Sequence, residues 1–161
     1  MTDEITVHFS LNGEQCSIRT FADTKLVDLL REDLALTAVK PACRVGRCGS
    51  CLVLMNGHAV NACLVMAWQI EDARILSPEA LAALPEGRAV REALVDEVAF
   101  QCGYCAPGFT VALTALLQRR PDATESEVRT ALGGNLCRCT GYSSILRGAA
   151  RAQQILRGEP A

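Results

Sequence analysis

Nine cysteines constrain this chain more than any other feature, because eight of them fall into two groups, one in each half of the sequence. The first group comprises Cys43, Cys48, Cys51 and Cys63, and the second comprises Cys102, Cys105, Cys137 and Cys139. In a reducing compartment so many thiols are more often metal ligands than disulfides, and an odd count leaves one thiol unpaired in any all-disulfide scheme. The sequence therefore predicts two thiolate metal sites.

The first group is spaced C-x4-C-x2-C, with a more distant fourth cysteine. This is the plant-type spacing for a [2Fe–2S] cluster. A loop that supplies three thiolates must wrap closely and point backbone N–H groups at the sulfur atoms, and Gly46 and Gly49 allow the positive φ that this requires. Zinc is the alternative, but four-cysteine zinc sites usually use two close pairs of cysteines. The spacing favours iron–sulfur over zinc.

The second group is spaced C-x2-C and then, after 31 residues, C-x-C. Residues i and i+2 do not share a face of an ordinary helix, so Cys137 and Cys139 must lie on an irregular turn. The glycines at 133, 134 and 141 favour such a turn. By itself this group predicts a four-thiolate site for iron–sulfur or zinc. A redox-active C-x2-C pair is a further alternative, but it leaves Cys137 and Cys139 unexplained and lacks a βαβ context.

Hydrophobic periodicity predicts a small mixed sheet in the first half. Alternation from Ile5 to Leu11 and the turn Asn12-Gly13 predict a hairpin, and residues 52–60 predict a second hairpin around Asn56-Gly57. Residues 74–76 predict a last strand. Leucines at 26, 29, 30 and 34 predict one helix, capped by Asp23 or Thr24. We also expect the ninth cysteine, Cys16, to be buried in this half. For Trp68 we expect burial in the same core, with contact to another subunit as the alternative.

Four stretches with helical spacing predict a four-helix bundle in the second half. Their apolar stripes begin at Val90, Phe109, Val128 and Ile145; the first runs through Leu94 to Val98, and Thr124 opens a capping box before the third. Proline and glycine between Ser77 and Gly87 predict a linker. We therefore expect domains over 1–76 and 87–161, joined by a linker over 77–86.

Composition excludes several other classes of protein. A net charge of −2 argues against a nucleic-acid binder that relies on a basic surface. No apolar run reaches the roughly 18 residues that a membrane span needs. The N-terminal residues lack the basic-then-apolar profile of a secretory signal, so we expect a cytoplasmic protein. The chain has no G-x-G-x-x-G or P-loop pattern for a nucleotide.

Three segments together resemble the iron–sulfur subunit of the molybdenum hydroxylases, the family of xanthine oxidase, carbon monoxide dehydrogenase and aldehyde oxidoreductase. They are the cysteine run 43–63, the sequence QCGYCAPGF at 101–109 and the sequence GNLCRCTGY at 134–142. The resemblance extends from Val7 to about Ile155, and the third segment is close to diagnostic by itself.

The resemblance implies an α+β fold, with an N-terminal β-grasp plant-type ferredoxin domain followed by a helical bundle, each holding one [2Fe–2S] cluster. It implies that a large partner subunit hydroxylates the substrate at a molybdenum–pterin cofactor. Electrons would pass to the bundle cluster, then to the ferredoxin-type cluster, and then to FAD in a medium subunit or to another acceptor. The family's pterin contacts correspond here to Gln101 and Cys139, the latter also an iron ligand. A heterotrimer, or a dimer of heterotrimers, is the expected assembly.

Two cluster domains fill the chain, so we expect an electron relay without catalytic residues or a substrate pocket of its own. A free-standing ferredoxin-like carrier is a competing hypothesis, but a carrier needs only the first cluster. A zinc-binding interaction module is another, and visible absorption would distinguish it, because zinc sites are colourless.

Overall fold

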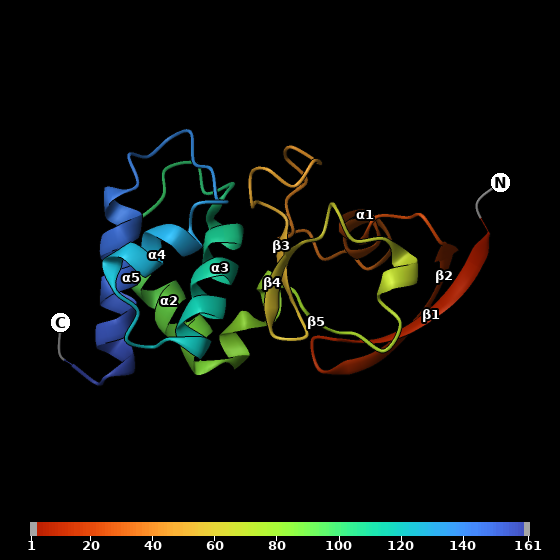
Figure 1. The fold of residues 1–161 in the computed structure, drawn as a ribbon, viewed down its shortest axis with the longest axis horizontal. Coiled ribbons are helices and arrows are strands. Elements are labelled where there is room, and N and C mark those ends of the chain that lie inside the picture. The colour runs from red at the N-terminus through yellow and green to blue at the C-terminus, as the bar shows by residue number, and fades with distance from the viewer. Residues whose placement is uncertain (1–2, 160–161) are drawn as a thin grey trace.

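The computed structural model describes residues 3–159 and shows two halves that lie side by side along the long axis of the molecule (Figure 1). The N-terminal half contains a sheet and short helical turns, whereas the C-terminal half is helical. This confirms the predicted mixed α+β class.

One five-stranded sheet forms the centre of the N-terminal half. Its strands are β1 (Glu4–Leu11), β2 (Glu14–Phe21), β3 (Leu52–Met55), β4 (His58–Asn61) and β5 (Arg74–Leu76). The spatial order is β2-β1-β5-β3-β4. Because β5 runs parallel to β1 and antiparallel to β3, this short strand joins the two hairpins into one sheet.

Both predicted hairpin turns are confirmed. The φ angles are 55° at Asn12 and 92° at Gly13, and 52° at Asn56 and 81° at Gly57. Positive φ at both central residues is characteristic of the two-residue turn whose twist matches that of the flanking strands. The Asn12 side chain also secures the end of β5, since its Nδ2 donates to Ser77 Oγ at 3.1 Å and its Oδ1 accepts from the Ser77 amide at 2.9 Å.

The helix predicted from the leucine spacing is present, but only its first turn is α-helical and the rest is π-helical. A short turn, α1 (Leu26–Asp28), continues directly into the π-helical segment η1 (Leu29–Asp33). The Leu34 amide bonds the Leu29 carbonyl at 3.2 Å, which is the i→i−5 pattern of a π turn. The core of this half comprises the buried side chains of Val7, Phe9, Leu26, Leu29, Leu30, Val53, Ile70 and Ile75.

The predicted cap of this helix is wrong. Neither Asp23 nor Thr24 caps it, because the backbone of a neighbouring segment already accepts from its first amides. The Leu26 amide donates to the Val65 carbonyl at 2.8 Å, and the Val27 amide donates to the Ala62 carbonyl at 3.1 Å. Backbone acceptors therefore replace the side-chain oxygen that usually satisfies a helix start.

Trp68 is not buried, contrary to the prediction. It lies in a single 3-10 turn, η2 (Ala67–Gln69), with 61% of its surface exposed. The smaller Ala67 and Ile70 point into the core instead. Cys16 is partly buried and packs against the same core, in partial agreement with its prediction.

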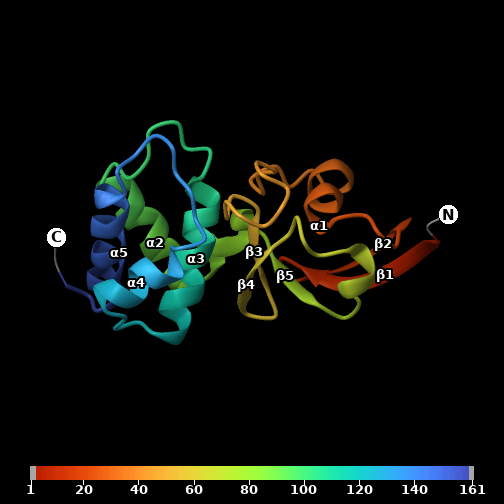
Figure 2. The ribbon, with the colours of Figure 1, turned by 45° about the horizontal axis from the view of Figure 1, so that its top comes forward.

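Four helices form the C-terminal half: α2 (Pro85–Asp96), α3 (Ala106–Arg119), α4 (Glu125–Ala131) and α5 (Ser143–Leu156). They contact one another in a ring in which α2 and α4 each touch both α3 and α5 (Figure 2). Their largest fully buried side chains are those of Phe109, Leu113, Leu117 and Ile145. No helix within residues 3–159 is long and apolar enough to span a membrane.

A packed segment precedes α2, within the stretch predicted to be a linker. The 3-10 turn η3 (Pro78–Ala83) inserts Leu81 into the helical core, where it is fully buried. Gly87, in the first turn of α2, lies so close to the Leu81 carbonyl that a Cβ atom there would be 2.0 Å from its oxygen. This segment is therefore fixed against the helices.

The ends of two helices show one prediction confirmed and one corrected. Thr124 and Glu127 form the predicted capping box at α4, with the Thr124 amide donating to Glu127 Oε2 at 2.8 Å and the Glu127 amide donating to Thr124 Oγ1 at 3.3 Å. Val98 does not continue the buried stripe of α2. It lies beyond the helix end with φ of 47° and 77% of its surface exposed, where the Ala99 amide closes the helix by bonding the Leu94 carbonyl.

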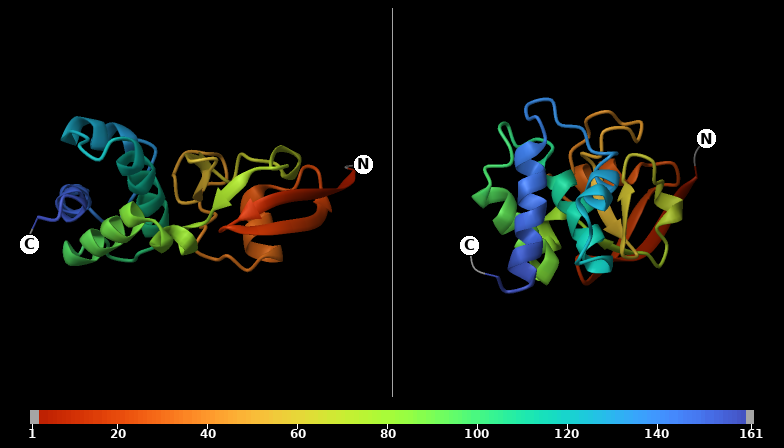
Figure 3. Two further views of the ribbon diagram at one scale, coloured as in Figure 1. Left: turned by 90° about the horizontal axis from the view of Figure 1, so that it is seen from below. Right: turned by 60° about the vertical axis from the view of Figure 1, so that its left-hand side comes forward.

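The two halves share buried surface, because α3 packs against β3 and β4 (Figure 3). Leu52 and Leu54 of β3 belong to the same buried cluster as the helical core. This packing brings the start of α3 next to the loop that precedes β3.

Candidate metal centres

The first cysteine set lies at one corner of the sheet. Cys43, Cys48 and Cys51 belong to the loop that leads into β3, and Cys63 follows β4. Cys51 and Cys63 are buried, whereas Cys43 and Cys48 are partly exposed. The structure thus brings together all four thiols that the sequence predicts for the first site.

Backbone amides in this loop point at the sulfur atoms. The Gly46 amide donates to Cys63 Sγ and the Arg47 amide donates to Cys43 Sγ, both at 3.3 Å. Positive φ at Arg44 (57°) and Gly46 (76°) curls the loop so that its N–H groups face inward. Such donors offset the negative charge of thiolates.

The four thiols are free, and they influence one another's ionisation. Cys43 is influenced by Cys48, and Cys51 by both Cys63 and Cys48. The Val45 amide, with smaller contributions from the Cys48 thiol and the Arg47 and Cys48 amides, lowers the pKa of Cys43 to about 6, so this thiol ionises readily. Burial raises the pKa of Cys51 to about 12, so its ionisation requires a compensating cation.

The second cysteine set lies at one end of the helices, on two neighbouring loops. Cys102 and Cys105 precede α3, and Cys137 and Cys139 lie between α4 and α5. Cys139 Sγ is 3.6 Å from Cys102 Sγ, and Cys137 influences the ionisation of Cys105. The four predicted thiols therefore come together from two loops, with Cys137 and Cys139 on the irregular turn that the C-x-C spacing requires.

Tyr142 holds the C-x-C turn in place. Its hydroxyl accepts from the Cys137 amide at 2.8 Å and donates to the Asn135 carbonyl at 3.4 Å. Its ring packs on Phe109 with centroids 6.1 Å apart, and its backbone is left-handed, with φ of 65°. The sequence analysis did not assign this role to Tyr142.

Burial and hydrogen bonding shift the pKa values of Cys105, Cys137 and Cys139 in different directions. Burial raises the pKa of Cys105 to about 12. Burial of Cys137 also opposes ionisation, but hydrogen bonds from Thr140, Cys139 and Cys105 together outweigh it and lower the pKa of Cys137. The contact with the Cys102 thiol raises the pKa of Cys139.

Cys102 and Cys139 form the exposed side of this site. Gln101, the other predicted pterin contact, is exposed on the same loop as Cys102. Within residues 3–159, no three His, Cys, Asp or Glu side chains surround a point that would hold one metal ion.

Three contacts join the loops of the two sets. The Leu136 amide donates to the Cys48 carbonyl at 3.0 Å. Gly49 packs against Gly134 and the buried Asn135. Lys40 Nζ lies 5.9 Å from the centroid of the Tyr104 ring. Sequence reasoning missed these contacts, although glycine beside a predicted ligand cysteine is a usable signal of close approach.

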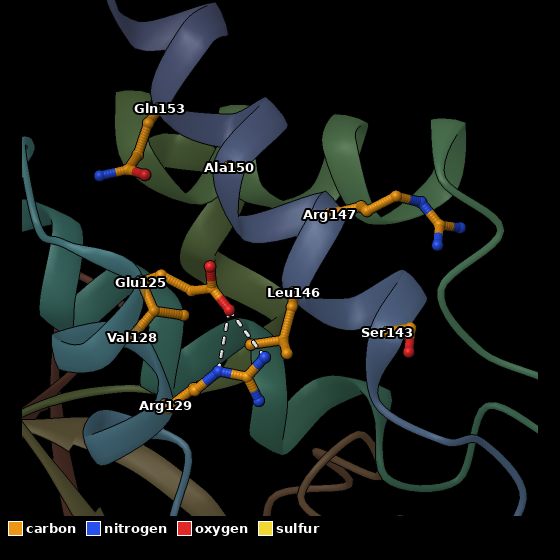
Figure 4. A pocket seen from close by; sticks show the side chains of 8 residues that line it. All are labelled: Glu125, Val128, Arg129, Ser143, Leu146, Arg147, Ala150 and Gln153. Atoms are coloured by element: carbon orange, nitrogen blue, oxygen red, sulfur yellow. Dashed lines mark hydrogen bonds and ion pairs between the residues drawn. The ribbon is translucent and has the colours of Figure 1, made fainter.

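A surface pocket of about 440 Å³ lies elsewhere, between α4 and α5 (Figure 4). Its lining includes Arg129, which pairs with Glu125 at 2.7 Å, and Arg147, which pairs with Glu97 at 2.7 Å. None of the cysteines lines it. The chemistry predicted from the sequence therefore belongs to the thiol sets.

Comparison with known families gives a match for each half of the chain. The family described as "2Fe-2S iron-sulfur cluster binding domain" matches residues 9–82, and the family described as "[2Fe-2S] binding domain" matches residues 78–150. The nicotinate dehydrogenase small FeS subunit of Eubacterium barkeri is 43% identical over 143 residues, which cover 89% of this chain and 91% of the relative. The chain belongs to the iron–sulfur subunits of the molybdenum hydroxylases. It is accordingly a subunit of the oxidoreductase class.

Other members of this subunit family agree in sequence and in fold. The xanthine dehydrogenase iron-sulfur-binding subunit of Escherichia coli O157:H7 is 40% identical over 147 residues, which cover 90% of this chain and 92% of the relative. The aldehyde oxidoreductase of Desulfovibrio desulfuricans superposes with a TM-score of 0.90 at 34% identity, covering 97% of this chain and 18% of that one. The quinoline 2-oxidoreductase structure from Pseudomonas putida 86 superposes with a TM-score of 0.86 at 33% identity, covering 98% of this chain and 99% of that one. The same fold therefore occurs as a chain of this length and as part of a longer one.

Proposed function

We propose that this chain is the electron-transfer subunit of a multi-subunit molybdenum hydroxylase, relaying electrons from the molybdenum–pterin centre through two [2Fe–2S] clusters to FAD or another acceptor. The observation that carries the proposal is the hydrogen bond from the Leu136 amide to the Cys48 carbonyl. Leu136 is bonded to Cys137, so one hydrogen bond joins the backbones of the two cysteine sets. That connection suits a chain whose task is to pass electrons between them.

The donor chemistry of the first set fits a [2Fe–2S] cluster. The proposed ligands are Cys43, Cys48, Cys51 and Cys63. Their C-x4-C-x2-C spacing with a distant fourth cysteine is the plant-type spacing for this cluster, whereas four-cysteine zinc sites usually use two close pairs of cysteines. The amides of Gly46 and Arg47, already directed at sulfur, would stabilise the negative charge of the ligands.

The second set also supplies four thiols, and the match of residues 78–150 to a [2Fe-2S] binding domain supports the same kind of cluster there. The proposed ligands are Cys102, Cys105, Cys137 and Cys139. When bound, each cluster supplies one-electron redox chemistry. Tyr142 and Thr140 would orient the C-x-C ligands through the hydrogen bonds described above.

The exposed side of the second set supports the proposed partner. Gln101 and Cys139 are the proposed pterin contacts, and both are exposed in the isolated chain. A large molybdenum-binding subunit would cover them, and a medium FAD-binding subunit would accept the electrons, in a cytoplasmic heterotrimer or dimer of heterotrimers. This chain would contribute no catalytic residue.

The finer description of the fold belongs to the same proposal. Residues 1–76 would form a β-grasp plant-type ferredoxin domain, and residues 87–161 a helical-bundle cluster domain, with 77–86 between them. The parallel pairing of β1 with β5 and the ring of four helices support this division.

The test is metal analysis and low-temperature EPR on the dithionite-reduced protein, purified anaerobically with whatever copurifies. We expect about four irons per chain and two overlapping signals with different relaxation. Copurifying larger chains would identify the complex. Two irons with one signal, or zinc in place of iron, would overturn the relay.

A further inference from the structure

Gly108, in the first turn of α3, lies directly against the loop of the first cysteine set. A Cβ atom at Gly108 would be 2.1 Å from the carbonyl oxygen of Gly49 and 3.1 Å from the Cα atom of Ser50. Real Cβ contacts are essentially never shorter than 3.0 Å. Any side chain at this position would therefore push α3 and the loop apart.

Space, and not backbone conformation, accounts for glycine at position 108. Its φ lies outside the left-handed region, so an L-residue could adopt the same backbone. Glycine is also a poor helix former compared with alanine, which makes it an unfavourable choice here unless the close approach requires it. The approach is backbone against backbone, so no flexible side chain can move aside.

The opposite side of the contact is restricted as well. Gly49 has a φ of 68°, and a Cβ atom there would be 2.7 Å from both Asn135 Nδ2 and the Gly134 carbonyl oxygen. Asn135 is buried and immediately precedes the Leu136 amide that bonds Cys48. The loop of the first set is therefore held between α3 and the C-x-C loop.

Ligand cysteines flank both glycines. Gly49 lies between Cys48 and Cys51, and Gly108 follows Cys105 by three residues. The contact between the two glycines therefore lies beside proposed ligands of both sets.

We propose that Gly49 and Gly108 are positioning residues that set the separation of the two [2Fe–2S] clusters and, through it, the rate of electron transfer between them. This inference rests on the proposed function. It assigns the spacing to one backbone contact between α3 and the loop of the first set.

The test compares Gly108→Ala with a matched control, Gly87→Ala, in the full-length holoprotein. Each glycine is the third residue of its helix, and each Cβ would meet a backbone carbonyl oxygen, at 2.1 Å and 2.0 Å respectively. The Gly87 contact is with Leu81, away from both cysteine loops. The two variants therefore share a similar local strain and differ in whether it falls between the clusters.

The readout is the magnetic coupling between the two reduced clusters in EPR, together with the rate of electron transfer between them after rapid reduction. Dipolar coupling falls steeply with distance. We expect Gly108→Ala to retain wild-type iron content with a smaller splitting and a slower transfer rate, and Gly87→Ala to retain the wild-type splitting. Wild-type splitting and rate in Gly108→Ala would overturn the inference.

A second variant keeps the test decisive if Gly108→Ala does not fold. Gly49→Ala alters the other glycine of the proposal, where a Cβ atom would be 2.7 Å from the Gly134 carbonyl oxygen, so the splitting should again decrease. An unchanged splitting would overturn the inference. Failure of the proposed function is distinguishable, because wild-type protein would then lack two EPR signals.

Discussion

The sulfur atoms of Cys102 and Cys139 lie 3.6 Å apart at the exposed end of the helices. They come from the two separate loops before α3 and before α5, so the contact depends on how the four helices pack. Because this pair is exposed while Cys105 is buried, the second site is open on one side only.

We expect Cys139→Ser to disrupt the second cluster and leave the first intact. Serine supplies a weaker ligand, and the first set shares no cysteine with the second. Iron should fall from about four to about two per chain, with one of the two EPR signals lost. The control is Cys16→Ser, outside both sets, which should keep full iron content. Retention of both signals in Cys139→Ser would contradict the ligand assignment.

We expect Val98→Gly to stabilise the chain. A β-branched residue with φ of 47° is strained, and the side chain that causes the strain is 77% exposed. Relief should raise the free energy of unfolding by about 1 kcal/mol and the melting temperature by about 3 °C. Val95→Gly is the matched control, because Val95 is also exposed but lies within α2, where glycine should destabilise. Thermal unfolding followed by circular dichroism measures both, and a lower melting temperature for Val98→Gly would contradict the strain.

The capping box of α4 should make stability depend on pH. Hydrogen bonds from Thr124 lower the pKa of Glu127 below its usual 4.5. A carboxylate with a lowered folded-state pKa stabilises the fold above its unfolded-state pKa, and this contribution is lost as the pH falls through the folded-state value. Glu127→Gln should therefore reduce stability at pH 7 and show a smaller further loss below about pH 4.5 than the wild type. Denaturant titrations across this range measure the difference, and parallel profiles would contradict it.

Trp68 should report a solvent-exposed indole. It is the only tryptophan in the chain and is 61% exposed in η2. We expect acrylamide to quench its fluorescence in the folded chain almost as efficiently as in the denatured chain. Strong protection in the isolated folded chain would mean that Trp68 is buried, as its hydrophobicity alone predicts.

The sequence predicted well the features that depend on neighbouring residues. The turns at Asn12-Gly13 and Asn56-Gly57 and the capping box at Thr124 are local, because the residues that form them are adjacent or three positions apart. The start of α1 was not predictable in this way. Its amides are satisfied by carbonyls of Val65 and Ala62, nearly forty residues further along the chain.

The candidate site shows the same difference between features set by neighbouring residues and contacts between distant ones. Cysteine spacing alone selected eight thiols that the structure brings together as two sets. The contacts between the sets were not predictable, since they join residues from opposite halves, such as Leu136 with Cys48 and Gly108 with Gly49. Periodicity also assigned Val98 to a buried stripe, because it contains no signal for the end of α2.

The central position of β5 determines when the sheet can be completed during synthesis. The hairpins β1–β2 and β3–β4 each pair strands that are adjacent in sequence and can form as soon as they emerge from the ribosome. Arg74 and Ile75 pair with Ser10 and Leu11, which lie more than sixty residues earlier in the sequence. β5 can therefore join the hairpins only after all the residues between these positions have been translated. A nascent chain that ends before Arg74 contains the residues of both hairpins and every cysteine of the first set, but it lacks the strand that joins the hairpins into one sheet.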